Sequence, residues 1–320
     1  MTAARQRLVH FQATDGLNLA GLLYEPARQA QDVVIFLHGN GDSSIFHSAR
    51  TNLIGEELTR RGIAWFPFNN RGAYMVKRLA RVRNGRRESI VAGMAYEKIR
   101  DCVHDIDGAI RFCRAAGFSR VHLVGHSTGA NKICVYNYYK PRNRVRSYLL
   151  LAGGDDSGLY RERWGDRRFA AVIERCRQKI RDRQGKVLVP EALSPFFISW
   201  SSLYDTINPD GDYNVFPFLE VIRGRRLSRK PLFRHFRSIR KPTLALYGAD
   251  DEDCFGEVAG CVEILARFAP PRNRMTFEIV PGANHGLSGK ETWLAGRIAD
   301  WIGSGHPAHP RSPHIGSGSE

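Results

Sequence analysis

The sequence has no apolar run that approaches the ~20 residues needed to span a bilayer as a helix. Its first ten residues include basic side chains but no apolar stretch like that of a secretory leader, so we expect no secretory signal. It also has no C-x-x-C pair, because its six cysteines are scattered at Cys102, Cys113, Cys134, Cys176, Cys254 and Cys261. These absences argue against a disulfide framework or a thiolate metal site. They favour small buried thiols in a reducing compartment, which we take to be the cytoplasm.

Acidic residues are outnumbered by basic ones, which leaves a formal net charge of +16 over 320 residues. Such a balance permits acidic substrates, anionic membrane surfaces or nucleic acid as partners. No zinc-finger pattern, RNA-binding aromatic motif or basic zipper accompanies the charge, so we expect no specific nucleic-acid partner. Most of the excess is arginine spread along the chain, which favours a solvated basic surface.

The most informative stretch is 121–132, which reads V-H-L-V-G-H-S-T-G-A-N-K. Val121–Val124 favours a buried strand, and a helical pattern runs from Ala130 to Tyr139. Ser127 therefore occupies a G-x-S-x-G motif between a strand and a helix, where that motif forms a sharp turn that exposes the serine hydroxyl. The glycines leave room for the turn, and the helix amides favour negative charge. The simpler alternative is a glycine-rich connection with a surface serine.

Two later strands also end in polar residues. One predicted apolar strand runs into an acidic stretch, and the next ends in a turn that contains His285. A histidine can take the proton of Ser127 and later return it, while a carboxylate holds the imidazole tautomer and stabilises its charged form. We predict that Asp251 is this acid, with Asp250 and Glu252 as the alternatives.

A fourth piece lies upstream of the serine. Val33–Leu37 is a continuous apolar run, as expected of a strand buried on both faces. The sequence His38-Gly39-Asn40-Gly41 follows it at once. Taken alone, this is a glycine-containing loop that a plain turn capped by Asp42 or Ser43 would also explain.

In this order the four pieces resemble the α/β-hydrolase superfamily, over residues 33–302. The resemblance implies a mostly parallel central sheet with helices on both faces and an inserted cap. It implies a nucleophile, a general base and an orienting acid, which here are Ser127, His285 and Asp251. It also implies an oxyanion hole made by the backbone amides of Asn40 and Thr128.

The resemblance also divides the chain. We expect residues 1–154 and 242–302 to form the hydrolase core, 155–241 to form the cap and 303–320 to be a flexible tail. Within these parts we expect a hairpin over 8–24, further strands at 63–68, 145–152, 243–247 and 275–280, and helices at 48–60, 96–116, 169–183, 256–268 and 291–302.

Two segments have alternative interpretations. Residues 74–87 form a predicted basic loop that either lines the mouth of the site or is simply solvated. The aromatic stretch 198–218 either walls a substrate pocket or forms the core of the cap. The candidates for substrate contact are His38, Gly39, His126, Trp200 and Tyr204.

These features predict a serine hydrolase that cleaves a small carboxylic ester or thioester through an acyl-enzyme, without a cofactor or a metal ion. The basic loop favours anionic substrates. Two alternatives remain: an acyltransferase that uses the same triad, and a non-catalytic binding protein on the same scaffold. The acyl chain, the leaving group and the oligomeric state are not determined by the sequence.

Overall fold

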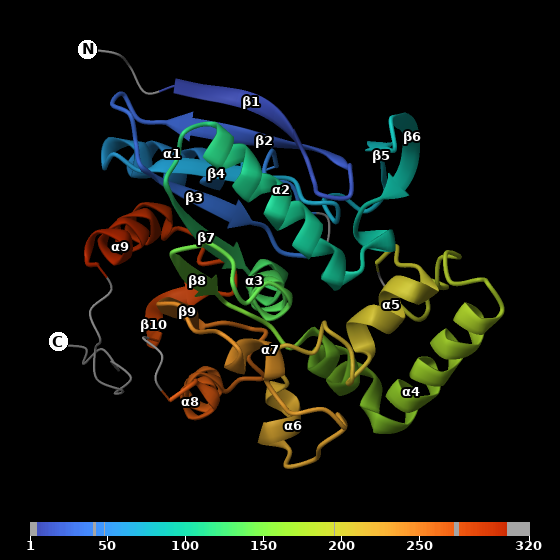
Figure 1. The fold of residues 1–320 in the computed structure, drawn as a ribbon. Helices are drawn as coiled ribbons and strands as arrows, with labels where there is room; N and C mark the ends of the chain where they lie inside the picture. Colours follow the sequence, from blue (N-terminus) through green and yellow to red (C-terminus); the bar gives the residue numbers. More distant parts are fainter. Residues whose placement is uncertain (1–4, 41–42, 48, 195, 272–274, 306–320) are drawn as a thin grey trace.

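A computed structural model describes residues 5–40, 43–47, 49–194, 196–271 and 275–305 (Figure 1). Its main sheet has eight strands in the spatial order β1-β2-β4-β3-β7-β8-β9-β10. The first two strands pair antiparallel to their neighbours, and all pairs from β4 to β10 are parallel. The predicted fold class is therefore confirmed. The strand bounds are β1 (Arg5–Gln12), β2 (Asn18–Glu25), β3 (Asp32–Leu37), β4 (Ala64–Phe68), β7 (Arg120–His126), β8 (Ser147–Leu151), β9 (Thr243–Asp250) and β10 (Met275–Asn284).

Helices cover both faces of this sheet and create two apolar cores. Along β3, Val33 and Ile35 pack on one face while Val34 packs on the other, which explains the continuous apolar run. One face is covered by α1 (Arg50–Arg60) and α9 (Glu291–Gly303). The other is covered by α2 (Cys102–Ala115), α3 (Thr128–Tyr139) and α8 (Val258–Phe268), with the short 3₁₀ turns η1 (Met94–Tyr96) and η2 (Ile99–Asp101) leading into α2.

The prediction that residues 74–87 form a loop is wrong. The structure forms an antiparallel hairpin there, with β5 (Lys77–Arg83) and β6 (Arg86–Ala92) (Figure 1). The sequence carried the signal, because Asn84-Gly85 is a favoured two-residue hairpin turn. Both residues have positive φ, 51° and 72°, as a type I′ turn requires. The arginines between the apolar positions hid the alternation of the strands.

The segment 155–241 contains α4 (Asp156–Arg181), α5 (Trp200–Ile207), α6 (Phe218–Ile222) and α7 (Arg234–Arg237). The helix predicted from residue 169 thus begins 13 residues earlier, at Asp156, because Asp155 caps it by accepting the amide of Gly158 at 2.7 Å. The chain kinks at Gly165, where φ is 72°. Helices α4 and α5 share a separate hydrophobic cluster that includes Phe169 and Leu203.

The cysteines follow the sequence expectation, since all six are free and buried. No helix in the described residues is long and apolar enough to cross a membrane. The predicted tail at 303–320 lies outside the described residues from position 306 onward, and Gly303 is the last residue of α9.

Candidate active site

Ser127 lies between β7 and α3, at the carboxyl end of a central strand. Its backbone has φ 56° and ψ −127°, a conformation that is costly for a residue with a side chain. The Ser127 amide donates a hydrogen bond to Leu151 O at 2.8 Å, and Ser127 O accepts one from the amide of Ala130 at 2.8 Å. The turn is therefore fixed on both sides, and the strain falls on the residue predicted to be the nucleophile.

The glycines on either side of Ser127 are required by space. A Cβ on Gly125 would lie 2.3 Å from Gly129 O, and a Cβ on Gly129 would lie 2.1 Å from Leu37 O. Neither contact is with a movable side chain, so the strand and helix can approach only if both positions lack a side chain. The G-x-S-x-G pattern therefore has a direct structural cause.

The predicted oxyanion loop begins beside the serine. A Cβ on Gly39 would come within 3.1 Å of Ser127 Cβ, so the backbone entering this loop runs against the nucleophile. Asn40 O accepts a hydrogen bond from Ser43 Oγ at 2.6 Å. The amide of Thr128, at the start of α3, donates no hydrogen bond to any described residue. Gly41 and Asp42 lie outside the described residues.

Neighbouring polar side chains hold this loop in place. Asn69 Oδ1 accepts a hydrogen bond from the amide of Ile45 at 2.9 Å, which ties the end of β4 to the segment that follows the loop. His38 is buried, with Nδ1 2.9 Å from Gly39 O and Nε2 3.2 Å from the amide of Asn70. These partners fit a neutral ring that donates from Nδ1, and burial lowers the pKa of His38 to about 3.

His285 follows β10 and meets the acidic segment after β9. Its Nδ1 lies 2.9 Å from Asp251 Oδ1, and Asp251 is only 3% exposed. Of the two alternative acids, Glu252 accepts the backbone amide of His285 at 2.9 Å. Asp250 is exposed and pairs with Asn284 across the strands. Among the three acids, the structure thus brings Asp251 to the imidazole.

The charges around His285 act on its pKa in the opposite direction to burial. Burial lowers the pKa of the imidazole, but the hydrogen bond and charge of Asp251, with the charges of Asp253 and Glu252, raise it above its ordinary value overall. The His126 ring lies beside it, with 5.2 Å between ring centroids. His126 Nε2 also lies 2.8 Å from His285 O, and burial together with the charge of Arg50 lowers the pKa of His126 to about 3.

The proposed substrate-contact residues divide into two groups. Gly39 and His126 lie beside Ser127 and His285, respectively, whereas both ring nitrogens of His38 are occupied by backbone groups. Trp200 is 2% exposed and packs in the α4–α5 cluster, with Tyr204 packed against that cluster. For these two aromatics, the structure agrees with the alternative in which they form a core of their own.

Sequence reasoning missed two carboxyl groups near His285. Asp253 Oδ2 lies 3.4 Å from His285 Nε2. Asp156, at the start of α4, interacts with both residues, and burial together with the charge of Asp253 raises its pKa to about 7. The acidic run after β9 signalled the first of these, but only folding brings Asp156 to the same place.

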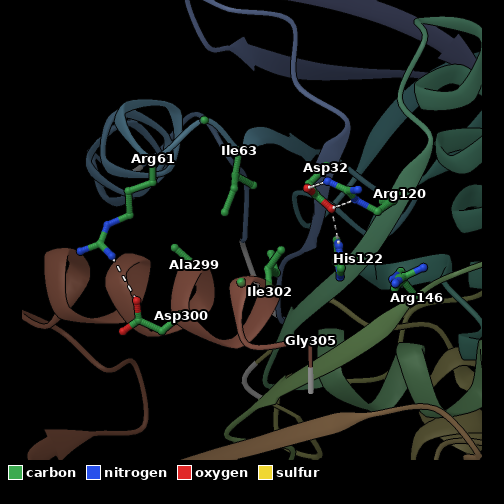
Figure 2. Close-up of a pocket in the computed structure, with 12 residues that line it drawn as sticks. Asp32, Arg61, Ile63, Arg120, His122, Arg146, Ala299, Asp300, Ile302 and Gly305 are labelled. Carbon is green, nitrogen blue, oxygen red and sulfur yellow. Dashed lines mark hydrogen bonds and ion pairs between the residues drawn. The ribbon is translucent and has the colours of Figure 1, made fainter. Parts of the chain in front are cut away.

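A cavity of about 750 Å³ lies at the opposite edge of the sheet, where β3 and β7 begin (Figure 2). There Asp32 is held between Arg120 and His122, and His122 Nδ1 lies 2.7 Å from Ser147 Oγ. This network also joins a serine, a histidine and an aspartate. However, Ser147 is fully buried within β8 and has no strained turn. Its geometry is that of a structural network.

Within the described residues, no three His, Cys, Asp or Glu side chains are grouped so as to hold a metal ion.

Comparisons with known proteins agree with this architecture. The sequence pattern of the alpha/beta hydrolase family matches residues 34–295. The esterase Pf2001 of Pyrococcus furiosus is structurally similar, with a TM-score of 0.55 and 16% identity over 96% of this chain and 95% of that one. Est1E of Butyrivibrio proteoclasticus has a TM-score of 0.55 and 13% identity, over 93% of this chain and 98% of that one. Mouse alpha/beta hydrolase domain-containing protein 10 has a TM-score of 0.55 and 16% identity, over 93% of this chain and 99% of that one.

At these identities the structural matches establish the fold alone. A comparison with curated protein sequences finds no significant match. The family pattern spans most of the chain, and the sheet order, the strained serine turn and the His–Asp pair at the carboxyl edge are features of the same architecture. The chain therefore belongs to the alpha/beta hydrolase family.

Proposed function

We propose that the protein is a serine hydrolase that cleaves a carboxylic ester or thioester through an acyl-enzyme intermediate. The observation that carries this proposal is the strained Ser127 turn beside Gly39, next to a His285–Asp251 pair at 2.9 Å. Strain of this kind persists where the surrounding structure enforces it, and it lifts a hydroxyl out of the sheet edge. The esterase relatives named above agree with this reaction class.

In the proposed mechanism, Ser127 Oγ attacks the substrate carbonyl and His285 Nε2 takes its proton. Asp251 holds the Nδ1–H tautomer and stabilises the imidazolium. The amides of Asn40 and Thr128 donate to the oxyanion, a contribution typically worth about 3 kcal/mol per donor in the transition state. His285 then protonates the leaving group and activates the water that releases the acyl group. No cofactor takes part.

The experiment compares fluorophosphonate labelling and p-nitrophenyl ester turnover in the wild type and in Ser127→Ala. Ser147→Ala is the matched control, because Ser147 belongs to the other serine–histidine–aspartate network. We expect Ser127→Ala to lose both signals and Ser147→Ala to keep labelling in its folded fraction. Labelling that persists in Ser127→Ala would contradict the proposal, and faster product formation with added alcohol would favour acyl transfer.

We propose that segment 155–241 is the cap of this enzyme. Its α4–α5 part has a hydrophobic cluster of its own, whereas Phe216, Phe218 and Phe236 later in the segment pack in the core beside the main sheet. Asp156, at the start of the segment, also reaches the neighbourhood of His285. The six unpaired thiols support a cytoplasmic location.

We also propose that anionic esters are favoured, through the β5–β6 hairpin. Arg83, Arg86 and Arg87 are exposed and have no carboxylate within ion-pair distance among the described residues. The hairpin tip lies by the β1–β2 turn, since Val82 donates to Gly16 O at 2.9 Å, so its charges act at a distance and not by contact with the acyl group. Reversing the three charges should raise KM for an anionic ester and leave a neutral ester unchanged. Equal effects on both esters would contradict this preference.

A further inference from the structure

The imidazole of His285 faces a carboxylate on each side. Asp251 Oδ1 lies 2.9 Å from Nδ1, and Asp253 Oδ2 lies 3.4 Å from Nε2. The contact at Nδ1 is a hydrogen bond, whereas the contact at Nε2 is within ion-pair distance only, so the two acids together favour the protonated ring. The proposed general base must instead have a free Nε2 to accept the proton of Ser127.

Ser127 is not the partner of Nε2 in this arrangement. Among the described residues, no hydrogen bond joins Ser127 Oγ to His285, whereas Asp253 lies within ion-pair distance of the same nitrogen. Asp253 therefore lies close to the ring nitrogen that Ser127 uses in the proposed mechanism.

One short segment positions the acids around the ring. The amide of Asp253 donates to Asp251 Oδ1 at 3.0 Å, and Glu252 Oε2 accepts the amide of His285 at 2.9 Å. The Asp251 side chain is almost completely buried, but that of Asp253 is 37% exposed. Asp251 is thus fixed, while Asp253 has room to leave the ring when a substrate enters.

Other charged and titratable groups also face His285. Burial and Arg50 keep His126 neutral, and Arg50 donates to Gly286 O from α1. Asp156 approaches from α4, and its raised pKa favours the neutral acid at low pH. Only Asp251 and Asp253 contact the ring nitrogens within ion-pair distance among the described residues.

We propose that Asp253 is a positioning residue that holds Nε2 of His285 in the resting enzyme and competes with Ser127 for the imidazole. This proposal rests on the proposed role of His285 as general base. When the site is empty, Asp253 stabilises the protonated ring and delays its use as a base until the pH rises. When a substrate is bound, the carboxylate must move aside for Nε2 to reach Ser127.

The test measures kcat/KM on a neutral p-nitrophenyl ester from about pH 5 to pH 9, because the acidic limb reports the base in the free enzyme. The variants are Asp253→Asn and the control Glu263→Gln, which removes one exposed charge from α8. We expect Asp253→Asn to move the acidic limb to lower pH by about half a unit to one unit, given that Asp253 is partly screened by solvent. Activity on that limb then rises by about three- to tenfold.

Asp253→Glu should return the limb toward the wild-type position, since it restores the carboxylate. A Glu variant shifted as far as the Asn variant would overturn the proposal, as would an Asn profile that matches the wild type or moves to higher pH. NMR titration of the His285 ring, assigned with His285→Gln, should show a lower pKa in Asp253→Asn alone. This titration needs no turnover, so it tests Asp253 even if Ser127→Ala retains activity and the proposed function fails.

Discussion

A buried ion pair on the helix that follows Ser127 provides the sharpest test of how the proposed site is supported. Lys132 lies on α3, one turn after Thr128, and is 1% exposed. Its Nζ is 2.6 Å from Glu97 Oε1 and 3.3 Å from Asn70 Oδ1. The amide of Asn70 in turn donates to His38 Nε2 at the base of the predicted oxyanion loop. We therefore expect the pair to stabilise both the fold and the loop.

Lys132→Met keeps most of the aliphatic stem but leaves Glu97 buried without its cation. Removing one partner of a buried pair costs about 3–5 kcal/mol. Unfolding entropy is about 2.1 cal/mol/K per residue, or about 0.67 kcal/mol/K for 320 residues. The expected fall in Tm is therefore about 4–7 °C. The double variant Lys132→Met/Glu97→Gln should recover to within about 1–2 kcal/mol of the wild type, because neither charge then remains buried.

Urea unfolding followed by circular dichroism measures both variants, with Tm from thermal scans. Turnover of the folded enzyme should also fall in Lys132→Met, since Asn70 Oδ1 loses a donor near the predicted oxyanion loop. A double variant no more stable than Lys132→Met would refute the reasoning, because the loss would then come from packing and not from an unpaired charge.

Two further predictions concern the turn and the acid. Gly129→Ala should cost on the order of 3 kcal/mol and lower kcat, because its Cβ would meet Leu37 O at 2.1 Å. Gly154→Ala is the control, with no atom within 4 Å of its Cβ. Thermal scans and kcat decide between steric clash and simple loss of a glycine. Asp251→Asn should lower kcat by about 10³–10⁴ and move the acidic limb to lower pH, since Asp251 raises the pKa of His285 and the ring must be neutral to act as a base. Asp250→Asn should keep near wild-type kcat, and the reverse result would assign the acid to Asp250.

The central strands were predictable because their sequence pattern is local. The run at Val33–Leu37 is apolar on both faces, and the structure packs it between two helical layers. Ser127 and His285 could be predicted to lie at one edge of the sheet because each follows such a strand, and the carboxyl ends of parallel strands meet at one edge. The choice among neighbouring acids depended on side-chain direction, which a consecutive acidic run does not specify.

The hairpin shows a different limit. The positive φ values of Asn84-Gly85 follow from a recognisable turn signal, but its flanking strands carry charged residues at most exposed positions. Only Leu79 and Ile90 pack against the core, so the apolar alternation is short. A polar hairpin attached to a large domain needs little burial of its own, and composition therefore indicated a loop.

The supporting charges were the least predictable part, because their partners are distant in sequence and chosen by packing. Lys132 and Glu97 are separated by 35 positions, and neither stands in a motif. Asp253 stands beside a predicted catalytic acid, yet its approach to Nε2 depends on where β10 delivers His285. A motif identifies groups that perform chemistry through local backbone geometry. The groups that set the protonation and orientation of the catalytic candidates are identified by burial and by distance in the folded chain. A carboxylate a few ångströms away shifts the pKa of a buried group whatever its position in the sequence. Variants of Asp253 and Lys132 therefore test the part of the mechanism that lies beyond the family motif.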